Sequence, residues 1–206
     1  MATTRGSVSE APAYSVEPLS SETWDLFDDV VDRHGGIFGG CWCIWFHPDR
    51  GEAGEGAEGN RARKKRYVEE GQAHAALLVT EQDGQREAIA WAEYGTPQEL
   101  PNIHHSKQYL AELDLLPDYR VTCIFVDRRY RRQGLAEAAL QGALDLIAQA
   151  GGGIVEGYPH VNRPDKKISA SFLYNGTRDM YARNGFDFIR PKGQFNTVMR
   201  RTVPAA

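Results

Sequence analysis

The chain contains 206 residues, of which 41% are hydrophobic and 25% are charged. Globular domains have close to these proportions, so the composition excludes a wholly disordered or fibrous protein, and the length indicates one domain with some elaboration. The 24 Lys and Arg residues are outnumbered by 28 Asp and Glu residues, giving a formal net charge of −4. This balance argues against a protein that coats nucleic acid, although it leaves room for a local basic patch.

The sequence carries no membrane or secretion signal. Its longest apolar run, residues 37–46, is shorter than the roughly 18 residues needed to span a bilayer. The first twenty residues lack a basic region followed by an apolar stretch. Three cysteines, a small and odd number, favour reduced thiols over a disulfide framework. We therefore predict a cytoplasmic protein with one hydrophobic core and no membrane partner.

The N-terminal part of the chain predicts a strand and a helix. Residues 1–12 are small and polar and are expected to form a flexible N-terminus, and a short strand is expected at 13–18. Ser20 or Ser21 is a good N-cap for the helix that follows. Its apolar residues recur every three or four positions, at Trp24, Phe27, Val30 and Val31. The glycine pair at 35–36 is expected to end this helix.

Residues 51–60, GEAGEGAEGN, form a low-complexity stretch. They contain no apolar side chain larger than Ala, so burial cannot offset the entropy of ordering them, and a mobile loop is predicted. Asn60 is the expected N-cap of a basic helix, RARKKRYVEE. Two strand-like runs follow, at 75–80 and 87–94, and the Asp83-Gly84 pair between them predicts a hairpin.

The second half of the chain predicts a parallel unit. Aromatic and β-branched residues at 120–126 favour a buried strand, the periodic segment 134–150 favours a helix, and a strand is expected at 154–158. A strand, helix and strand of these lengths form a right-handed crossover with a parallel strand pair. The remaining elements are a short helix at 178–184 and two strands, one near Phe186 and one near Val198. The fold class is therefore mixed α/β, with antiparallel N-terminal strands joined to a parallel βαβ core, in a single domain over residues 13–203.

The loop between the buried strand and the long helix, VDRRYRRQGLA, has the features of an anion site. A helix N-terminus offers N–H groups without intrahelical partners and about half a positive charge. Gly134 and Ala136 are small enough to let a diphosphate approach the backbone, and arginines at 128, 129, 131 and 132 raise the local potential. The loop is neither a Walker loop nor a dinucleotide fingerprint. A solvated basic loop and a nucleic-acid contact at RRYRR are the alternatives that remain open.

The same loop resembles the acetyl-CoA-binding loop of the GNAT (Gcn5-related) N-acetyltransferases. Its R-x-x-G-x-A pattern spans Arg131 to Ala136, after a strand and at the start of a long helix. Downstream, residues 180–186 resemble the Y-x-x-x-G-F signature of that family. The whole chain is also similar to a bacterial subgroup that carries C-W-C near the first helix (41–43 here) and V-E-G-Y-P after the long one (155–159 here).

This resemblance implies the GNAT fold and an acetyl-CoA-dependent transferase that moves an acetyl group directly to a primary amine of a small molecule or peptide. It implies that the backbone of Ile124, Phe125 and Val126 holds the pantetheine arm, with the Val126 N–H facing the thioester carbonyl. Tyr181 is implied as the general acid that protonates the departing thiolate. The residues implied to cradle the pyrophosphate with their N–H groups are Arg131, Arg132, Gln133, Gly134, Leu135 and Ala136.

Two positions depart from the family pattern. Tyr174 stands where many members carry Asn, seven residues before the signature tyrosine, so one hydrogen bond to CoA is expected to differ. Ala136 replaces the commoner glycine. A non-catalytic acyl-CoA sensor of the same fold is the alternative function. We expect no nucleic-acid partner, and the exposed sheet edges make a homodimer one expectation.

Direct attack requires a neutral amine, so some group must accept its proton. Glu156 and Glu93 are the leading candidates, because each lies in an apolar strand segment where a carboxylate is costly without a partner or a function. The alternative for each is the solvent-facing side of its strand. His104 and His105 are further candidates as base or as contacts to the acceptor, with a solvated loop as the alternative.

The segment around the two neighbouring cysteines has other interpretations. Cys41 and Cys43 lie near His34 and His47 in sequence, but C-x-C without a second ligand pair is a weak zinc signal. We therefore expect no metal, and we expect the two thiols to form a buried pair. Three aromatic residues here either wall the acceptor pocket or pack in the core: Trp42, Trp45 and Phe46.

Overall fold

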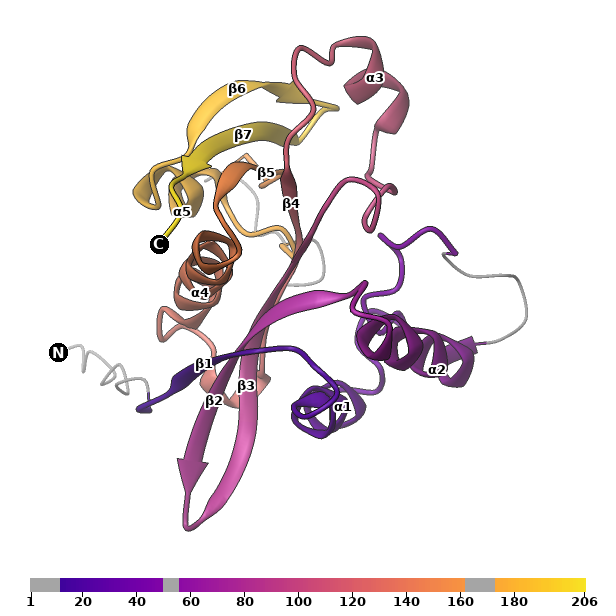
Figure 1. Cartoon of the computed structure of the whole chain (residues 1–206), viewed down its shortest axis with the longest axis vertical. Helices are drawn as coiled ribbons and strands as arrows, with labels where there is room; N and C mark the ends of the chain where they lie inside the picture. The colour runs from indigo at the N-terminus through magenta and orange to yellow at the C-terminus, as the bar shows by residue number, and fades with distance from the viewer. Residues whose placement is uncertain (1–11, 50–55, 162–172) are drawn as a thin grey trace, which may run out of the picture.

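The computed structural model describes residues 12–49, 56–161 and 173–206 (Figure 1). These residues form a seven-stranded sheet in the order β1-β2-β3-β4-β5-β7-β6. The β4 and β5 strands are parallel, and the other neighbouring pairs are antiparallel. The predicted fold class, a mixed sheet with antiparallel N-terminal strands and a parallel βαβ core, is confirmed.

The elements have the following bounds. The strands are β1 (Ser15–Pro18), β2 (His74–Gln82), β3 (Gln85–Gly95), β4 (Tyr119–Val126), β5 (Gly153–Gly157), β6 (Asp187–Lys192) and β7 (Asn196–Val203). The helices are α1 (Trp24–Asp32), α2 (Gly56–Glu69), α3 (Ser106–Ala111), α4 (Leu135–Gln149) and α5 (Arg178–Arg183), with a 3-10 turn, η1 (Arg128–Tyr130). The short helix α3 was not predicted from the sequence. None of the described helices is long and apolar enough to cross a membrane.

The predicted hairpin is present as β2 and β3. Asp83 and Gly84 both have positive φ, 52° and 75°, which is the backbone that a two-residue hairpin turn requires for the right-handed twist of its strands. This turn explains why the Asp-Gly pair was an accurate signal. The ribbon extends from the body of the molecule in Figure 1 and provides most of the antiparallel half of the sheet.

Two predicted helix starts are wrong. Thr23, and neither Ser20 nor Ser21, is the N-cap residue of α1, because Ser20 accepts the Glu22 N–H and forms the turn before the helix. The start of α2 is also earlier than predicted: the helix includes residues 56–60, which were expected to belong to a mobile loop.

The early start of α2 has a packing reason. The Asn60 side chain does not cap the helix but donates to the Gly40 carbonyl, 2.8 Å away. A Cβ at Gly40 would come within 2.7 Å of Ala57 Cβ, so the first turn of α2 packs closely on the chain at Gly40. The rest of the predicted loop, residues 51–55, lies outside the described residues, as does all of the predicted N-terminal segment except Pro12.

Helices cover both faces of the sheet, with α1 and α2 on one face and α4 on the other (Figure 1). Side chains alternate between faces along a strand, so Trp91 and Phe125 pack with α1 while Ala92 and Ile124 pack with α4. The Trp91 and Phe125 rings stack at 4.5 Å between centroids. The core is therefore divided into two layers by the sheet.

The two parallel strands separate after a short contact. Only Tyr119–Val121 of β4 pairs with β5, at Val155–Gly157. Beyond Val121, the side of β4 that faces away from β3 has no strand beside it among the described residues. Instead, the chain that leads into α5 approaches this side, and the Ile124 N–H donates to the Tyr174 carbonyl at 2.6 Å. We call residues 122–126 on this side the open edge of β4.

Candidate active site

Backbone groups along the open edge of β4 alternate in direction. Ile124 points its N–H at the open edge, towards Tyr174, whereas the Asp127 N–H bonds the Ile89 carbonyl on β3. Since alternate residues of a strand face the same side, the Val126 backbone faces the open edge and the Phe125 backbone pairs with Trp91 of β3. Of the three residues expected to hold a pantetheine arm, two are therefore oriented for it, and Ile124 is already bonded to Tyr174.

The anion-site loop, residues 131–136, lies between η1 and α4. Gly134 is the N-cap residue of α4 with φ +81°, a conformation that favours glycine. A Cβ at Gly134 would meet no protein atom within 4 Å, so the space in front of the helix is open. Arg131 donates its Nε–H to the Val126 carbonyl at 3.3 Å, which connects the loop to the open edge of β4.

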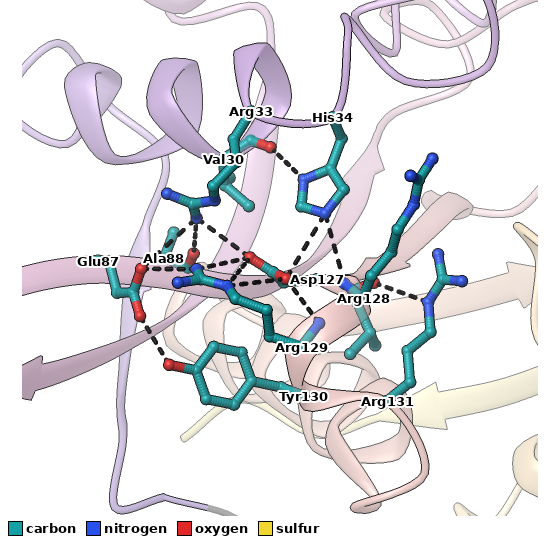
Figure 2. A network of polar contacts seen from close by, with 11 residues as sticks. Val30, Arg33, His34, Glu87, Ala88, Asp127, Arg128, Arg129, Tyr130 and Arg131 are labelled. Carbon is teal, nitrogen blue, oxygen red and sulfur yellow. Dashed lines mark hydrogen bonds and ion pairs between the residues drawn. The ribbon is translucent and has the colours of Figure 1, made fainter.

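A buried carboxylate holds the start of this loop in place (Figure 2). Asp127 accepts from the backbone and guanidinium of Arg129, and it pairs with Arg33 at 3.2 Å. His34 Nε2 lies 3.5 Å from the same carboxylate. Burial raises the pKa of Asp127, but the hydrogen bonds from Arg129 outweigh burial, so the pKa is lowered overall. The network thus ties the end of β4 to α1.

This network changes the charge expected of the loop. Arg129 also pairs with Glu87 at 2.7 Å, and Arg33 lies 3.6 Å from the same residue. The expectation that all four loop arginines raise the local potential is therefore wrong for Arg129, since two carboxylates neutralise it. Arg128 and Arg131 point away from Asp127 in Figure 2, and Arg128, Arg131 and Arg132 are all exposed.

A pocket of about 790 Å³ lies beside the open edge of β4, on the face of the sheet that α1 and α2 cover. Five parts of the chain form it: the segment between α1 and α2, the start of α2, the loop before α3, β4 at Cys123, and the chain before α5 at Tyr174. Its lining residues are Phe38, Gly39, Cys41, Cys43, Ile44, Trp45, Phe46, Asn60, His104, Cys123 and Tyr174.

Aromatic rings make up much of the pocket wall. Trp45 stacks on His104, with 4.1 Å between ring centroids and 19° between planes, and Phe46 lies 6.0 Å from the Tyr174 ring. Trp42 does not line the pocket; it is 2% exposed and packs in the core. The two alternatives for these aromatic residues are thus both realised, with Trp45 and Phe46 at the pocket and Trp42 in the core.

The three thiols gather at the same pocket. Cys43 Sγ lies 3.2 Å from Cys123 Sγ, and both residues are buried. Cys41 is half-buried, so the expected pairing of Cys41 with Cys43 is replaced by a pair that reaches β4. Burial and the neighbouring Cys43 raise the pKa of Cys41 to about 11, so this thiol is neutral at physiological pH. No three His, Cys, Asp or Glu side chains in the described ranges are grouped so as to hold a metal ion.

Tyr181 lies where β4 and β5 separate. Its ring packs against Gly157, the last β5 residue paired with β4, so closely that a Cβ there would overlap the ring. Within the described part of the chain, its hydroxyl is buried and has no hydrogen-bond partner. Burial and then the nearby Cys123 raise the pKa of Tyr181 well above its usual value. The phenol therefore keeps its proton at physiological pH.

Glu93 lies outside the pocket lining, in a buried ion pair. Its Oε1 is 2.5 Å from Lys64 Nζ and 3.5 Å from His47 Nε2, and Thr122 donates to Oε2 at 2.7 Å. Burial raises the pKa of Glu93, but Lys64 and His47 outweigh it and lower the pKa to about 2. A carboxylate with so low a pKa and such close partners is poorly suited to accept a proton from an amine.

Glu156 is also paired and also lies outside the pocket lining. Arg200 donates to its Oε1 through two nitrogens, at 2.7 and 3.1 Å. The Tyr109 and Tyr158 hydroxyls donate to Oε2, at 2.8 and 3.2 Å. These partners lie on α3, just after β5, and on β7. Glu156 therefore connects α3 to these two strands and does not face the pocket.

The chain matches one family of proteins by sequence. Residues 42–167 match the model described as the acetyltransferase (GNAT) family. Since this match covers more than half of the chain, the protein belongs to the GNAT family of acetyltransferases. A search of curated proteins gave no match.

Solved structures with the same fold come from distant organisms. A GNAT-family protein of Desulfovibrio desulfuricans aligns with TM-score 0.51 and 18% identity, covering 93% of this chain and 99% of that one. The mosquito arylalkylamine N-acetyltransferase like 5b aligns with TM-score 0.54 and 13% identity, over 92% and 100% of the two chains. The ribosomal-protein-S5-alanine acetyltransferase of Vibrio fischeri aligns with TM-score 0.51 and 15% identity, over 95% and 96%. At these identities the likeness concerns the fold.

Proposed function

We propose that this protein is an acetyl-CoA-dependent N-acetyltransferase that moves the acetyl group directly to a primary amine. The observation that carries the proposal is the open edge of β4, which runs from the anion-site loop at 131–136 to the pocket at Cys123. In this proposal, the loop cradles the pyrophosphate at one end of the edge and the pocket receives the acceptor at the other. The GNAT family uses acetyl-CoA as its co-substrate, which agrees with that geometry.

The residues of this chain fit acetyl-CoA. The open space in front of Gly134 and the N–H groups of the first turn of α4 suit a pyrophosphate, with exposed Arg131 and Arg132 beside it. The Val126 N–H is directed to the open edge and suits a carbonyl of the bound molecule. Tyr174 must release Ile124 if the pantetheine arm is to bond both backbone groups of this edge.

When bound, acetyl-CoA supplies an acetyl group activated as a thioester. The Val126 N–H, held in a rigid strand, stabilises negative charge that develops on an acyl oxygen. Tyr181 is protonated at physiological pH, and in this proposal it is the general acid that gives its proton to the departing thiolate. The absence of a hydrogen-bond partner for its hydroxyl, among the described residues, leaves that proton available for transfer.

We propose His104 as the group that accepts the proton of the amine. Its ring lines the pocket and is fixed by stacking on Trp45, whereas Glu93 and Glu156, the carboxylates that the sequence suggested first, are both engaged in ion pairs elsewhere. An imidazole accepts a proton near neutral pH without the desolvation cost of a buried carboxylate.

The experiment that tests the function is calorimetric titration with acetyl-CoA. We compare the wild type with Gly134→Glu, which puts a negative charge in the cradle, and with Gly134→Ala, which carries the same strain of a side chain at positive φ without the charge. We expect binding in the wild type and in Gly134→Ala, and a loss of at least tenfold in Gly134→Glu. Absence of binding in the wild type would refute the proposal.

A non-catalytic acyl-CoA sensor of the same fold is the second candidate. It is favoured by the bond between Ile124 and Tyr174, which occupies part of the open edge and would be exchanged on binding. A sensor binds acetyl-CoA but transfers no acetyl group to any amine. Titration together with a transfer assay over a broad amine panel therefore separates the two functions.

A further inference from the structure

The pocket beside β4 contrasts with the rest of the surface in its chemistry. No Lys, Arg, Asp or Glu is among its described lining residues, which are mainly aromatic and apolar. One of its polar groups, the amide of Asn60, is already bonded to the Gly40 carbonyl. Burial and then the neighbouring Cys43 raise the pKa of Cys41, and contact with Cys43 and then burial raise the pKa of Cys123, so these two thiols are neutral.

Such a pocket discriminates among amines by their charge. A charged group that leaves water without a counter-charge loses several kcal/mol of hydration. A polyamine, an aminoglycoside or a basic peptide would bring two or more ammonium groups, and the described lining offers no carboxylate to pair with them. A monoamine carries one charge, and that charge is removed when the amine is deprotonated for attack.

The aromatic side chains that line the pocket favour an acceptor whose amine is attached to an apolar, aromatic group. Trp45, stacked on His104, forms a flat surface, and Phe38 lies at the rim with its ring 6.1 Å from Tyr174 and 42% of the residue exposed. Aromatic rings attract one another in offset and edge-to-face arrangements beyond the effect of burial alone. The volume of about 790 Å³ is ample for one or two rings with a short side chain.

We infer that the acceptor is a primary monoamine on an apolar, aromatic body, with its ring among Phe38, Trp45 and Tyr174 and its amine towards Cys123 and the open edge of β4. This inference rests on the proposed function and specifies the acceptor of that same site. In the transfer, His104 receives the proton that the ammonium group loses to become a neutral amine, the C–N bond to the acetyl carbon forms and the C–S bond breaks. Tyr181 gives its proton to the thiolate, and the second proton of the nitrogen restores the Tyr181 hydroxyl.

The test uses an acceptor panel and a matched pair of variants. We measure kcat/KM with acetyl-CoA for 2-phenylethylamine, tryptamine, spermidine and a lysine-containing peptide, in the wild type, Phe38→Ala and Phe188→Ala. Phe188 has the same exposed fraction as Phe38, 42%, but lies on β6 away from the pocket. We expect the two aryl amines to exceed spermidine and the peptide by at least tenfold, and Phe38→Ala alone to reduce this preference.

A separate binding measurement distinguishes failure of this inference from failure of the proposed function. Calorimetric titration with 2-phenylethylamine, without acetyl-CoA, is expected to show binding that Phe38→Ala weakens and Phe188→Ala does not. A higher kcat/KM for spermidine or the peptide overturns the acceptor class and leaves the acetyltransferase function standing. Binding of 2-phenylethylamine in a protein that binds no acetyl-CoA supports the pocket assignment and refutes the function.

Discussion

At the scale of single residues, two buried tyrosine hydroxyls differ in their hydrogen bonding. The Tyr109 hydroxyl donates to the buried carboxylate of Glu156 at 2.8 Å. The Tyr181 hydroxyl has no partner among the described residues, although it is equally buried. A buried polar group without a partner costs free energy, so its retention in Tyr181 is consistent with a role in the reaction. The two residues therefore make a matched pair for mutation.

Tyr181→Phe is expected to raise the free energy of unfolding, by about 1–3 kcal/mol, because it removes a buried hydroxyl without a partner, and to lower kcat about 100-fold because the general acid is removed. Tyr109→Phe is expected to do the reverse, destabilising by about 1–3 kcal/mol with little change in kcat. Urea unfolding and steady-state rates measure both. An unchanged kcat in Tyr181→Phe at every pH would exclude the acid role.

The neighbouring histidines provide a second matched pair. His104 lines the pocket, whereas His105 precedes α3 and places its ring near Gly193. We expect His104→Gln to lower kcat/KM about 10- to 100-fold and to remove the acidic limb of its pH profile, and His105→Gln to change neither. If both variants keep the wild-type pH profile, the proton of the amine leaves by another route.

At the scale of elements, buried charge connects α2 to the sheet. Lys64 of α2 and Glu93 of β3 are each 1% exposed and lie 2.5 Å apart. Two residues further along α2, on the exposed side of the helix, Arg66 pairs with Asp49 with more than half of both side chains exposed. Removing one member of a buried pair leaves an uncompensated charge, whereas an exposed pair contributes little. The two basic residues of α2 should thus differ strongly in their effect on stability.

Lys64→Met is expected to lower the free energy of unfolding by about 3–5 kcal/mol, and Arg66→Met by less than about 0.5 kcal/mol. Adding Glu93→Gln to Lys64→Met is expected to restore part of the loss, because the second change removes the unpaired charge and keeps an acceptor for Thr122. Urea unfolding of the four proteins measures these values. Equal effects of the two single variants would show that Lys64 carries no buried charge.

The same cluster predicts how stability depends on pH. Burial and then Lys64 lower the pKa of His47 below 6.5. The contribution of His47 to the free energy of unfolding is therefore present above pH 6.5 and is lost as the pH falls towards the folded pKa. Folding lowers the pKa of Glu93 from 4.5 to about 2. The contribution of Glu93 to the free energy of unfolding is therefore present above pH 4.5 and is lost as the pH falls through 2. We expect Tm to fall on acidification from pH 6.5, and Glu93→Gln to flatten the part below pH 4.5. A wild-type Tm that stays constant over this range would contradict the ion-pair geometry.

At the scale of the whole molecule, the site exists because β4 leaves β5 after three paired residues. The anion-site loop follows the end of β4, α5 lies at the point of separation, and the pocket opens on the opposite sheet face from α4. The Asp127 network holds this end of β4 against α1 and β3 (Figure 2). The arrangement brings the loop at 131–136 and the pocket to one strand.

Amide exchange resolved by NMR can test this geometry. On addition of acetyl-CoA, the Val126 amide, which faces the open edge, is expected to exchange more slowly because it gains a hydrogen bond. The Phe125 amide, which pairs with Trp91 in β3, is expected to keep its rate and serves as the control. Slowing at both amides to the same degree would indicate general stabilisation of the sheet, and slowing at neither would exclude Val126 as a contact.

Features that depend on near neighbours along the chain could be predicted from the order of the amino acids alone. The hairpin followed from Asp83-Gly84, the long helix from its periodic apolar face, and the position of the loop at 131–136 from the small residues at a helix start. These signals are local because turn geometry and helix periodicity are set within a few residues. The fold class and the place of the loop could be predicted for that reason.

Which charged and aromatic residues are available for chemistry depends on the folded arrangement. Glu93 and Glu156 looked alike in sequence, but Lys64 and Arg200, 29 and 44 residues away along the chain, neutralise them. Arg129 pairs with Glu87 of a distant strand, and His104 lines the pocket, where it stacks on Trp45. The electrostatic state of a side chain depends on what folding brings within a few ångströms of it, and no local pattern contains that information.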